Sequence, residues 1–159
     1  MAPDGIISFG QGCEGEPSLA ADCIADGIRK IRAATTRGQI NMNSNAGFPD
    51  GMKKIVDAGL DSLRVSMISA RDISYSVYYR ASYDLDAVKT SIRYALAHDV
   101  YVSINLLYFP GFNDRTEELA AWQDFFHTLP VQMIQMRNLN IDPTLFLHTM
   151  PPEQGAPIG

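Results

Sequence analysis

Residues 10–17, with the sequence Gly-Gln-Gly-Cys-Glu-Gly-Glu-Pro, have the side chains and spacing best suited to binding a ligand. They directly follow a short apolar run at residues 6–9. Glycine lets the backbone approach a ligand closely, and the carboxylates of Glu14 and Glu16 are suited to holding a cationic group. The pattern therefore predicts a strand that ends in a ligand-binding turn.

Composition and charge exclude several classes of function. The chain has 159 residues and a net charge of −5 without a basic block, which argues against nucleic-acid binding. No apolar run approaches the roughly 20 residues that span a bilayer, and residues 1–4 lack the features of a secretory signal. Cys13 and Cys23 match no zinc spacing, so we expect a reduced, cytoplasmic protein with no metal ligands of its own.

The elements that hold this turn follow from the apolar spacing, which predicts five strands alternating with four helices. The strands are expected at residues 6–9, 40–46, 63–67, 100–107 and 131–137. Residues 68–83 are expected to form a loop rich in Ser, Tyr and Arg, and Asp84 to cap the helix after it. Strict alternation of strands and helices favours a parallel sheet with right-handed crossovers. We expect residues 1–143 to form this domain and residues 144–159 to be a C-terminal extension.

Three of the expected strands alternate polar and apolar side chains, which decides between two kinds of parallel sheet. The polar positions are Asn41, Asn43 and Asn45, then Ser62, Arg64 and Ser66, then Tyr101, Ser103 and Asn105. A sheet with helices on both faces would be apolar on both, and an unpaired buried amide costs about 1–3 kcal/mol. The alternation therefore predicts an incomplete parallel (β/α) barrel of the TIM type, with helices on the outer face and a polar inner face. In such barrels the chemistry lies at the carboxyl ends of the strands.

The order of these segments resembles that of the radical S-adenosylmethionine (SAM) enzymes. The turn Gly15-Glu16-Pro17 is similar to the motif that follows the second strand in this family. Residues 40–46 resemble its third strand, 59–66 its fourth, 79–84 the loop and helix cap after it, 100–111 its fifth strand and 131–138 its sixth. The resemblance covers nearly the whole chain, to about Pro143.

The resemblance implies a partial six-stranded barrel that holds a [4Fe-4S] cluster and SAM. In this family, one-electron reduction cleaves SAM to a 5′-deoxyadenosyl radical, which abstracts hydrogen from a substrate. The cluster is bound by a Cys-x3-Cys-x2-Cys loop after the first strand, and this sequence contains no such loop. We therefore expect the chain to cover strands two to six of a larger enzyme and to be inactive alone.

The resemblance also implies which residues bind SAM. Glu16 would accept a hydrogen bond from the ammonium of SAM through the Gly15-Glu16-Pro17 turn; an ordinary solvated carboxylate in a turn is the alternative. Ser66 and Arg80 would hold its carboxylate or ribose, and arginine suits a carboxylate because its planar guanidinium binds two oxygens at once. For Arg80, an ordinary place in a surface loop is the alternative.

Four further residues would complete this site. Asn43 and Asn45 would face the lumen near the ribose or the substrate; alternatively, they belong to a polar ladder satisfied by neighbours and water. Asn105 would lie near the adenosyl group, and Arg137 near the adenine or the substrate. The sequence identifies neither a catalytic residue nor the substrate, which is a peptide or a small molecule.

Two other functions also fit an α/β barrel. A cluster-independent enzyme of the aldolase or phosphate-binding type would need a barrel lysine or a phosphate-binding glycine loop, whereas every lysine falls on an expected helix. A non-catalytic scaffold domain is the second alternative. An incomplete barrel also leaves an edge strand exposed, so we expect pairing between two copies of the chain as a hazard.

Overall fold

Five parallel strands form one sheet in which the strands lie side by side in chain order. The computed structural model describes residues 5–11 and 15–152. Within these residues the strands are β1 (Ile6–Phe9), β2 (Gln39–Ser44), β3 (Ser62–Met67), β4 (Tyr101–Tyr108) and β5 (Met133–Asn138), and every neighbouring pair is parallel. This sequential order is that of a (β/α) barrel, because a doubly wound sheet reverses its strand order at a switch point. The predicted fold class is confirmed.

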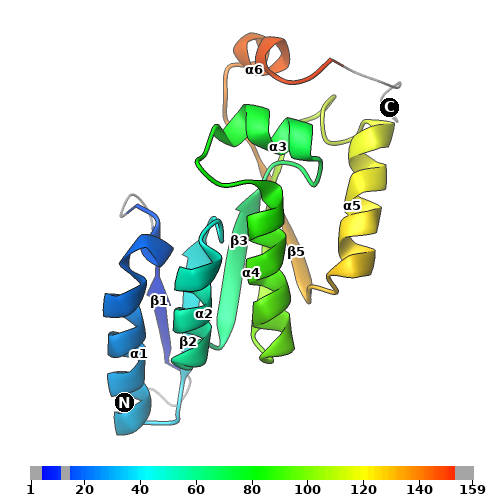
Figure 1. Ribbon diagram of the computed structural model, residues 1–159. Helices are drawn as coiled ribbons and strands as arrows, with labels where there is room; N and C mark the ends of the chain where they lie inside the picture. The colour runs from blue at the N-terminus through cyan, green and yellow to red at the C-terminus, as the bar shows by residue number, and fades with distance from the viewer. Residues whose placement is uncertain (1–4, 12–14, 153–159) are drawn as a thin grey trace.

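Most of the helices connect these strands and cover one face of the sheet, whereas α3 (Asp72–Tyr79) and α6 (Pro143–Thr149) lie past the upper ends of the strands in this view (Figure 1). A short 3₁₀ helix, η1 (Pro17–Ala20), and α1 (Ala21–Ala34) follow β1, and α2 (Pro49–Asp57) follows β2. The others are α3 (Asp72–Tyr79) and α4 (Leu85–Ala97) after β3, α5 (Thr116–Thr128) after β4, and α6 (Pro143–Thr149) after β5. Asp84 caps α4 as predicted, because its Oδ1 accepts a hydrogen bond of 2.8 Å from the backbone N–H of Ala87.

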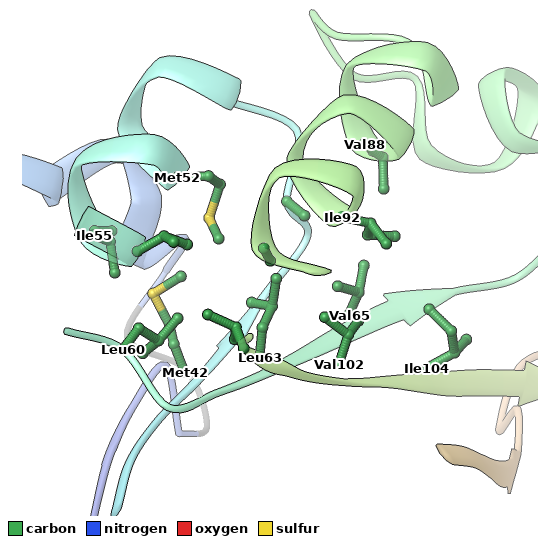
Figure 2. Close-up of a cluster of buried hydrophobic side chains, with 14 of the residues drawn as sticks. Met42, Met52, Ile55, Leu60, Leu63, Val65, Val88, Ile92, Val102 and Ile104 are labelled. Carbon is green, nitrogen blue, oxygen red and sulfur yellow. The ribbon is translucent and has the colours of Figure 1, made fainter. Parts of the chain in front are cut away.

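The hydrophobic core lies between the helix layer and the apolar face of the sheet (Figure 2). Met42 on β2, Leu63 on β3 and Val102 on β4 are fully buried there, in one cluster with Met52 of α2 and Ile92 of α4. Full burial of one such side chain contributes about 1.5–3 kcal/mol. Because the pleat alternates side chains between the two faces, this burial turns the polar residues of the same strands to the opposite face.

Two helices, α3 and α6, lie where the sequence predicted none. Helix α3 occupies the expected loop; its Ser, Tyr, Ile and Val residues have modest helix propensity, and burial of Ser74 and Tyr75 holds it in place. Helix α6 packs Phe146, which is 2% exposed, against Ile68 and Phe112 in a second apolar cluster. Both helices are therefore stabilised by contacts with the rest of the fold, which the local sequence pattern does not reveal. The domain boundary drawn after residue 143 stays a prediction, although the residues directly after it belong to a packed helix.

The two outer strands, β1 and β5, each leave one backbone edge without a partner strand among the described residues. On β1 the side chain of Ile6 is 68% exposed, and every residue of β5 is exposed. In the described part of the chain, no helix combines the length and apolar character needed to cross a membrane.

Candidate cofactor-binding site

The candidate site lies on the polar face, where neighbouring strands bring hydrogen-bonding side chains together. The register sets Asn43 beside Arg64, and Ser66 beside Asn105. Because all the strands are parallel, their carboxyl ends and the turns that follow them lie at one edge of the sheet. The alternation seen in the sequence therefore places these side chains on one surface.

Glu16 anchors the turn after β1 to the end of β2. Its Oε1 accepts hydrogen bonds from the backbone N–H of Ser18 (3.0 Å) and from the hydroxyls of Ser18 and Ser44 (2.6 Å each). Its Oε2 accepts one from the backbone N–H of Asn45 (2.8 Å). Ser44 is buried on the helix side of β2, with its hydroxyl 3.8 Å from the sulfur of Met52. The carboxylate therefore lies at the helix side of the strand end, which leaves the backbone of the turn as the part most available to a ligand.

Two glycines give this turn a shape that other residues adopt only with strain. Gly10 has a φ of +73°, and a Cβ atom there would overlap the carbonyl oxygen of Asn43. Gly15 has a φ of +86°, and a Cβ atom there would meet nothing within 4 Å. The side-chain amide of Asn43 donates a hydrogen bond of 3.3 Å to the carbonyl of Gly10, which fixes the turn against β2. Glycine adopts this backbone conformation readily, and the space beside the backbone at Gly15 is open.

A second polar cluster joins β3 to β4. Nη2 of Arg64 donates a hydrogen bond to Oδ1 of Asn105 (2.7 Å), and Nδ2 of Asn105 donates one to the hydroxyl of Ser66 (3.0 Å). The side-chain amide of Asn105 is therefore held at both ends, and the residue is only 8% exposed. The hydroxyl of Tyr79, on α3, donates to the backbone carbonyl of Ser66 (3.0 Å). These contacts fix Ser66 near the end of β3, beside Asn105.

Two arginines make this part of the polar face electropositive. Burial, followed by the nearby charge of Arg137 on β5, lowers the pKa of Arg64 from its ordinary value. Among the described residues, no carboxylate forms an ion pair with either guanidinium. The face therefore favours a ligand that carries negative charge.

A hollow of about 430 Å³ opens on the same face, toward the amino-terminal ends of the strands. Its lining includes the first residues of four strands, which are Gln39, Ser62, Tyr101 and Met133. Arg64 also lines it, two residues before Ser66. The polar face thus has two regions along the strands: the hollow, and the carboxyl edge with the anchored turn.

Solved structures that resemble this chain share its fold at low sequence identity. A domain of pyruvate-formate lyase-activating enzyme from Bacteroides vulgatus has a TM-score of 0.63 at 13% identity, over 93% of this chain and 85% of that domain. HydG, a maturase of the [FeFe]-hydrogenase, has a TM-score of 0.61 at 19% identity, over 92% of this chain and 35% of its own. The radical S-adenosylmethionine methyltransferase TsrM from Kitasatospora setae has a TM-score of 0.57 at 15% identity, over 77% of this chain and 25% of its own. This chain has the fold of the radical SAM enzymes.

The radical SAM fold is recognised from structural similarity alone. The sequence matches no protein-family model, and it matches no curated protein. The resemblance stated from the sequence is confirmed at the level of the fold. The chain spans 35% of HydG and 25% of TsrM, so those proteins contain much that this chain does not.

Within this radical SAM fold, most of the predicted site residues are brought together in two groups. Pro17, the first residue of η1, belongs to the first group with Gly15 and Glu16; there Glu16 contacts Asn45, and Asn43 is bonded to the same turn. The second group is the contact between Ser66 and Asn105 on the next two strands. Their roles toward SAM stay predictions.

Two predicted site residues lie outside these two groups. Arg80 ends α3 in the left-handed conformation, with a φ of +47°, and its Nε donates to the carbonyl of Val77 (3.4 Å). It lines a separate hollow with residues of α6, so the structure does not bring it to Ser66. Arg137 is exposed on β5, at the strand position beside Leu107.

Two residues that shape the site, Arg64 and Tyr79, are not among those that the sequence predicts to bind SAM. The signal for Arg64 was present, because it shares the polar phase of β3 with Ser62 and Ser66. Tyr79 gave no comparable signal, because its place depends on α3, which the sequence pattern did not predict.

The described residues do not fit an iron–sulfur cluster. No group of three or more His, Cys, Asp or Glu side chains among them could hold a metal ion. Cys23 is exposed on α1. Cys13 and Glu14 lie outside the described residues.

Proposed function

We propose that this chain is the SAM-binding part of a cytoplasmic radical SAM enzyme. The observation that carries the proposal is the anchored turn: Gly15 and Glu16 follow β1 and are tied to the end of β2, in a sheet with the radical SAM fold. The structure of TsrM was solved with a SAM analog bound, which supports SAM as the ligand of this fold. Binding at the carboxyl edge also agrees with the usual place of chemistry in (β/α) barrels.

The groups at this edge fit the polar parts of SAM. Its ammonium needs acceptors, which the backbone carbonyls of the turn and the remaining acceptor position on Oε2 of Glu16 supply. Its carboxylate and ribose need donors, which are supplied by the hydroxyl of Ser66 on β3, the amide of Asn43 on β2 and the amide of Asn45 directly after β2. The open space at Gly15 lets a ligand reach the backbone.

The cluster requires ligands that the described residues do not provide. Such a cluster would supply the one-electron chemistry that this family carries out on SAM. The part played by this chain is narrower: the turn and the strand ends bind and orient SAM, and the polar face receives the substrate. We therefore expect the chain alone to bind SAM weakly and to catalyse no turnover.

The positions of the lysines argue against a Schiff-base enzyme of the same fold class. Lys30 lies on α1, Lys53 and Lys54 on α2, and Lys89 on α4, as the sequence predicted. These helices cover the outer face of the sheet (Figure 1). A Schiff base would need a lysine on the polar face, and the chain has no other lysine.

A matched pair of glycine variants tests the role of the turn. Gly15→Ala and Gly111→Ala each add a methyl group at a φ near +80°, with nothing within 4 Å of the new Cβ. Both should cost about 1–2 kcal/mol of stability, because L residues adopt this conformation reluctantly. SAM binding would be measured by calorimetry in the intact protein with its cluster reconstituted. Gly15→Ala should weaken SAM binding about tenfold or more, and Gly111→Ala should leave it unchanged.

One result would contradict the proposed role of the turn. If both variants bind SAM as tightly as the unmodified protein, the turn is not the cofactor site.

The parent gene gives an independent check. A Cys-x3-Cys-x2-Cys sequence encoded upstream of Met1 would support the proposal, and a genuine start codon with no such sequence would count against it as an enzyme assignment.

A further inference from the structure

Arg64 is a half-buried cation with an unused donor. It lies on the polar face of β3, and its Nη2 bonds Oδ1 of Asn105 (2.7 Å). Its Nε is buried and has no hydrogen-bond partner among the described residues. An arginine keeps its charge at all ordinary pH values, and a buried donor left unpaired is unfavourable. The Nε–H group of Arg64 therefore needs a hydrogen-bond acceptor that the described residues do not supply.

A second cation reinforces this position. Arg137 lies on β5, and its positive charge adds to burial in lowering the pKa of Arg64. The one carboxylate that lines the hollow, Asp61, already forms an ion pair with Arg32 and accepts a hydrogen bond from the N–H of Ile40 (2.6 Å). Among the described residues, therefore, no carboxylate is bonded to Arg64, and its positive charge is not balanced by an ion pair.

The hollow beside Arg64 has room for a ligand group that accepts hydrogen bonds from its guanidinium. Ser103 and Gln135 line this hollow of about 430 Å³ together with Arg64, and both carry neutral hydrogen-bonding groups. The hollow opens toward the amino-terminal halves of the strands, whereas the anchored turn follows the carboxyl end of β1. A ligand held at Arg64 would therefore lie deeper in the barrel than the proposed SAM site.

We propose that Arg64, supported by Arg137, binds a carboxylate of the substrate, held in place by the bond between Arg64 and Asn105. The proposal rests on the SAM-binding function proposed above. The planar guanidinium suits a carboxylate because two N–H groups can bond its two oxygens, and a phosphate shares this chemistry. The assignment makes the substrate an acidic small molecule or a peptide with an acidic group.

Titration with simple anions tests the site without SAM or a cluster. Acetate and inorganic phosphate would be added to the ¹⁵N-labelled 159-residue chain at constant ionic strength, with chloride as the reference anion. The arginine Nε–H resonances are observed. The resonance of Arg64 should shift and saturate with acetate, while that of Arg80 stays in place.

Two variants and one control separate a specific site from general attraction. Arg137→Gln, at an exposed position, should weaken acetate binding about threefold to tenfold by removing the second charge. Arg64→Lys keeps the charge and removes the planar fork; followed through the backbone amide resonances of β3, it should bind acetate at least tenfold more weakly. Arg80→Gln removes an exposed arginine from another hollow and should change nothing. If Arg64→Lys does not fold, Arg137→Gln against Arg80→Gln decides the question.

The outcomes separate this proposal from the proposed cofactor role. No movement of the Arg64 resonance with either anion would overturn the anion site, whatever SAM does. In the intact protein with SAM bound, acetate should still bind; its displacement by SAM would assign Arg64 to the cofactor carboxylate and overturn the substrate assignment. Failure of SAM to bind at all would remove the proposed function and leave the acetate result to stand alone.

Discussion

The carboxylate of Glu16 accepts a hydrogen bond of 2.6 Å from the hydroxyl of Ser44, and this contact joins the glycine-rich turn after β1 to the end of β2. Ser44 is buried on the helix side of its strand, so the contact lies beside the core and not on the polar face. The backbone N–H of Asn45 adds a second bond from the same strand end. Glu16 is therefore tied to the end of β2 through both of its carboxylate oxygens.

The first prediction concerns this anchor. Glu16→Gln replaces one carboxylate oxygen by an amide that donates, opposite groups that also donate, so at least one hydrogen bond is lost. We expect a loss of about 1–3 kcal/mol in the free energy of unfolding, measured by urea denaturation. Asp124→Asn, at an exposed position of α5, is the control for loss of charge and should change stability by less than about 0.5 kcal/mol. If Glu16→Gln unfolds like its control, the carboxylate does not anchor the turn.

The residues of this anchor show how far the sequence predicts the site. The alternation of the strands is enough to place Arg64 and Asn105 on the polar face, because the pleat fixes which side chains share a face. The same alternation assigns Ser44 to the apolar side with Met42, and nothing local shows that it bonds a residue 28 positions away. Long-range contacts of this kind depend on how the elements pack.

The same limit explains the two helices that the sequence pattern does not predict. Helix α3 depends on the burial of Tyr75, and α6 on the contact of Phe146 with Ile68 and Phe112. Neither segment has the long apolar repeat that predicts a helix from sequence alone. The five strands and the other main helices do have such repeats or runs, and they lie close to their predicted positions.

The second prediction concerns a carboxylate that is buried completely. Glu118 on α5 has no exposed surface, and its two oxygens accept hydrogen bonds from the hydroxyls of Ser69 and Ser74 and from a guanidinium nitrogen of Arg71. Glu118→Ala leaves these donors without their acceptor. We expect a loss of about 3–5 kcal/mol in the free energy of unfolding, by the same urea measurement.

A milder change at the same cluster makes this prediction specific. Ser69→Ala removes one hydrogen bond and keeps the carboxylate, so it should cost only about 1–2 kcal/mol. Asp124→Asn, on the same helix and exposed, again serves as the control. Equal losses for Glu118→Ala and Asp124→Asn would show that the cluster does not hold α5 to α3 and to the segment before α3.

The third prediction concerns alkaline pH. Burial raises the pKa of the Tyr79 hydroxyl above its ordinary value. In the unfolded chain a tyrosine titrates near about pH 10, so above that pH the folded chain binds more protons and its stability falls as the pH rises. Tyr79→Phe removes this titration. It also removes the hydrogen bond to the carbonyl of Ser66, at a cost of about 1 kcal/mol near neutral pH.

The measurement compares the pH dependence of stability. Urea unfolding at about pH 8 and at about pH 11 should show a smaller loss for Tyr79→Phe than for the unmodified chain. Tyr101→Phe, at an exposed position of β4, is the control and should lose as much stability as the unmodified chain. A loss for Tyr79→Phe as large as that of the control would mean that Tyr79 does not keep its proton in the folded state.

The last prediction concerns the outer strand β1, where Ile6 is 68% exposed beside a backbone edge that has no partner strand in the described residues. An exposed apolar edge can pair with a second copy, and a lysine there opposes pairing because it would bring charge into the new sheet. In sedimentation velocity, we expect the sedimentation coefficient of the unmodified chain to rise with concentration and that of Ile6→Lys to stay constant. Ile73→Lys, at a 53% exposed isoleucine on α3, adds the same charge away from the edge and should still associate. Equal suppression by both variants would point to general charge repulsion instead of strand pairing.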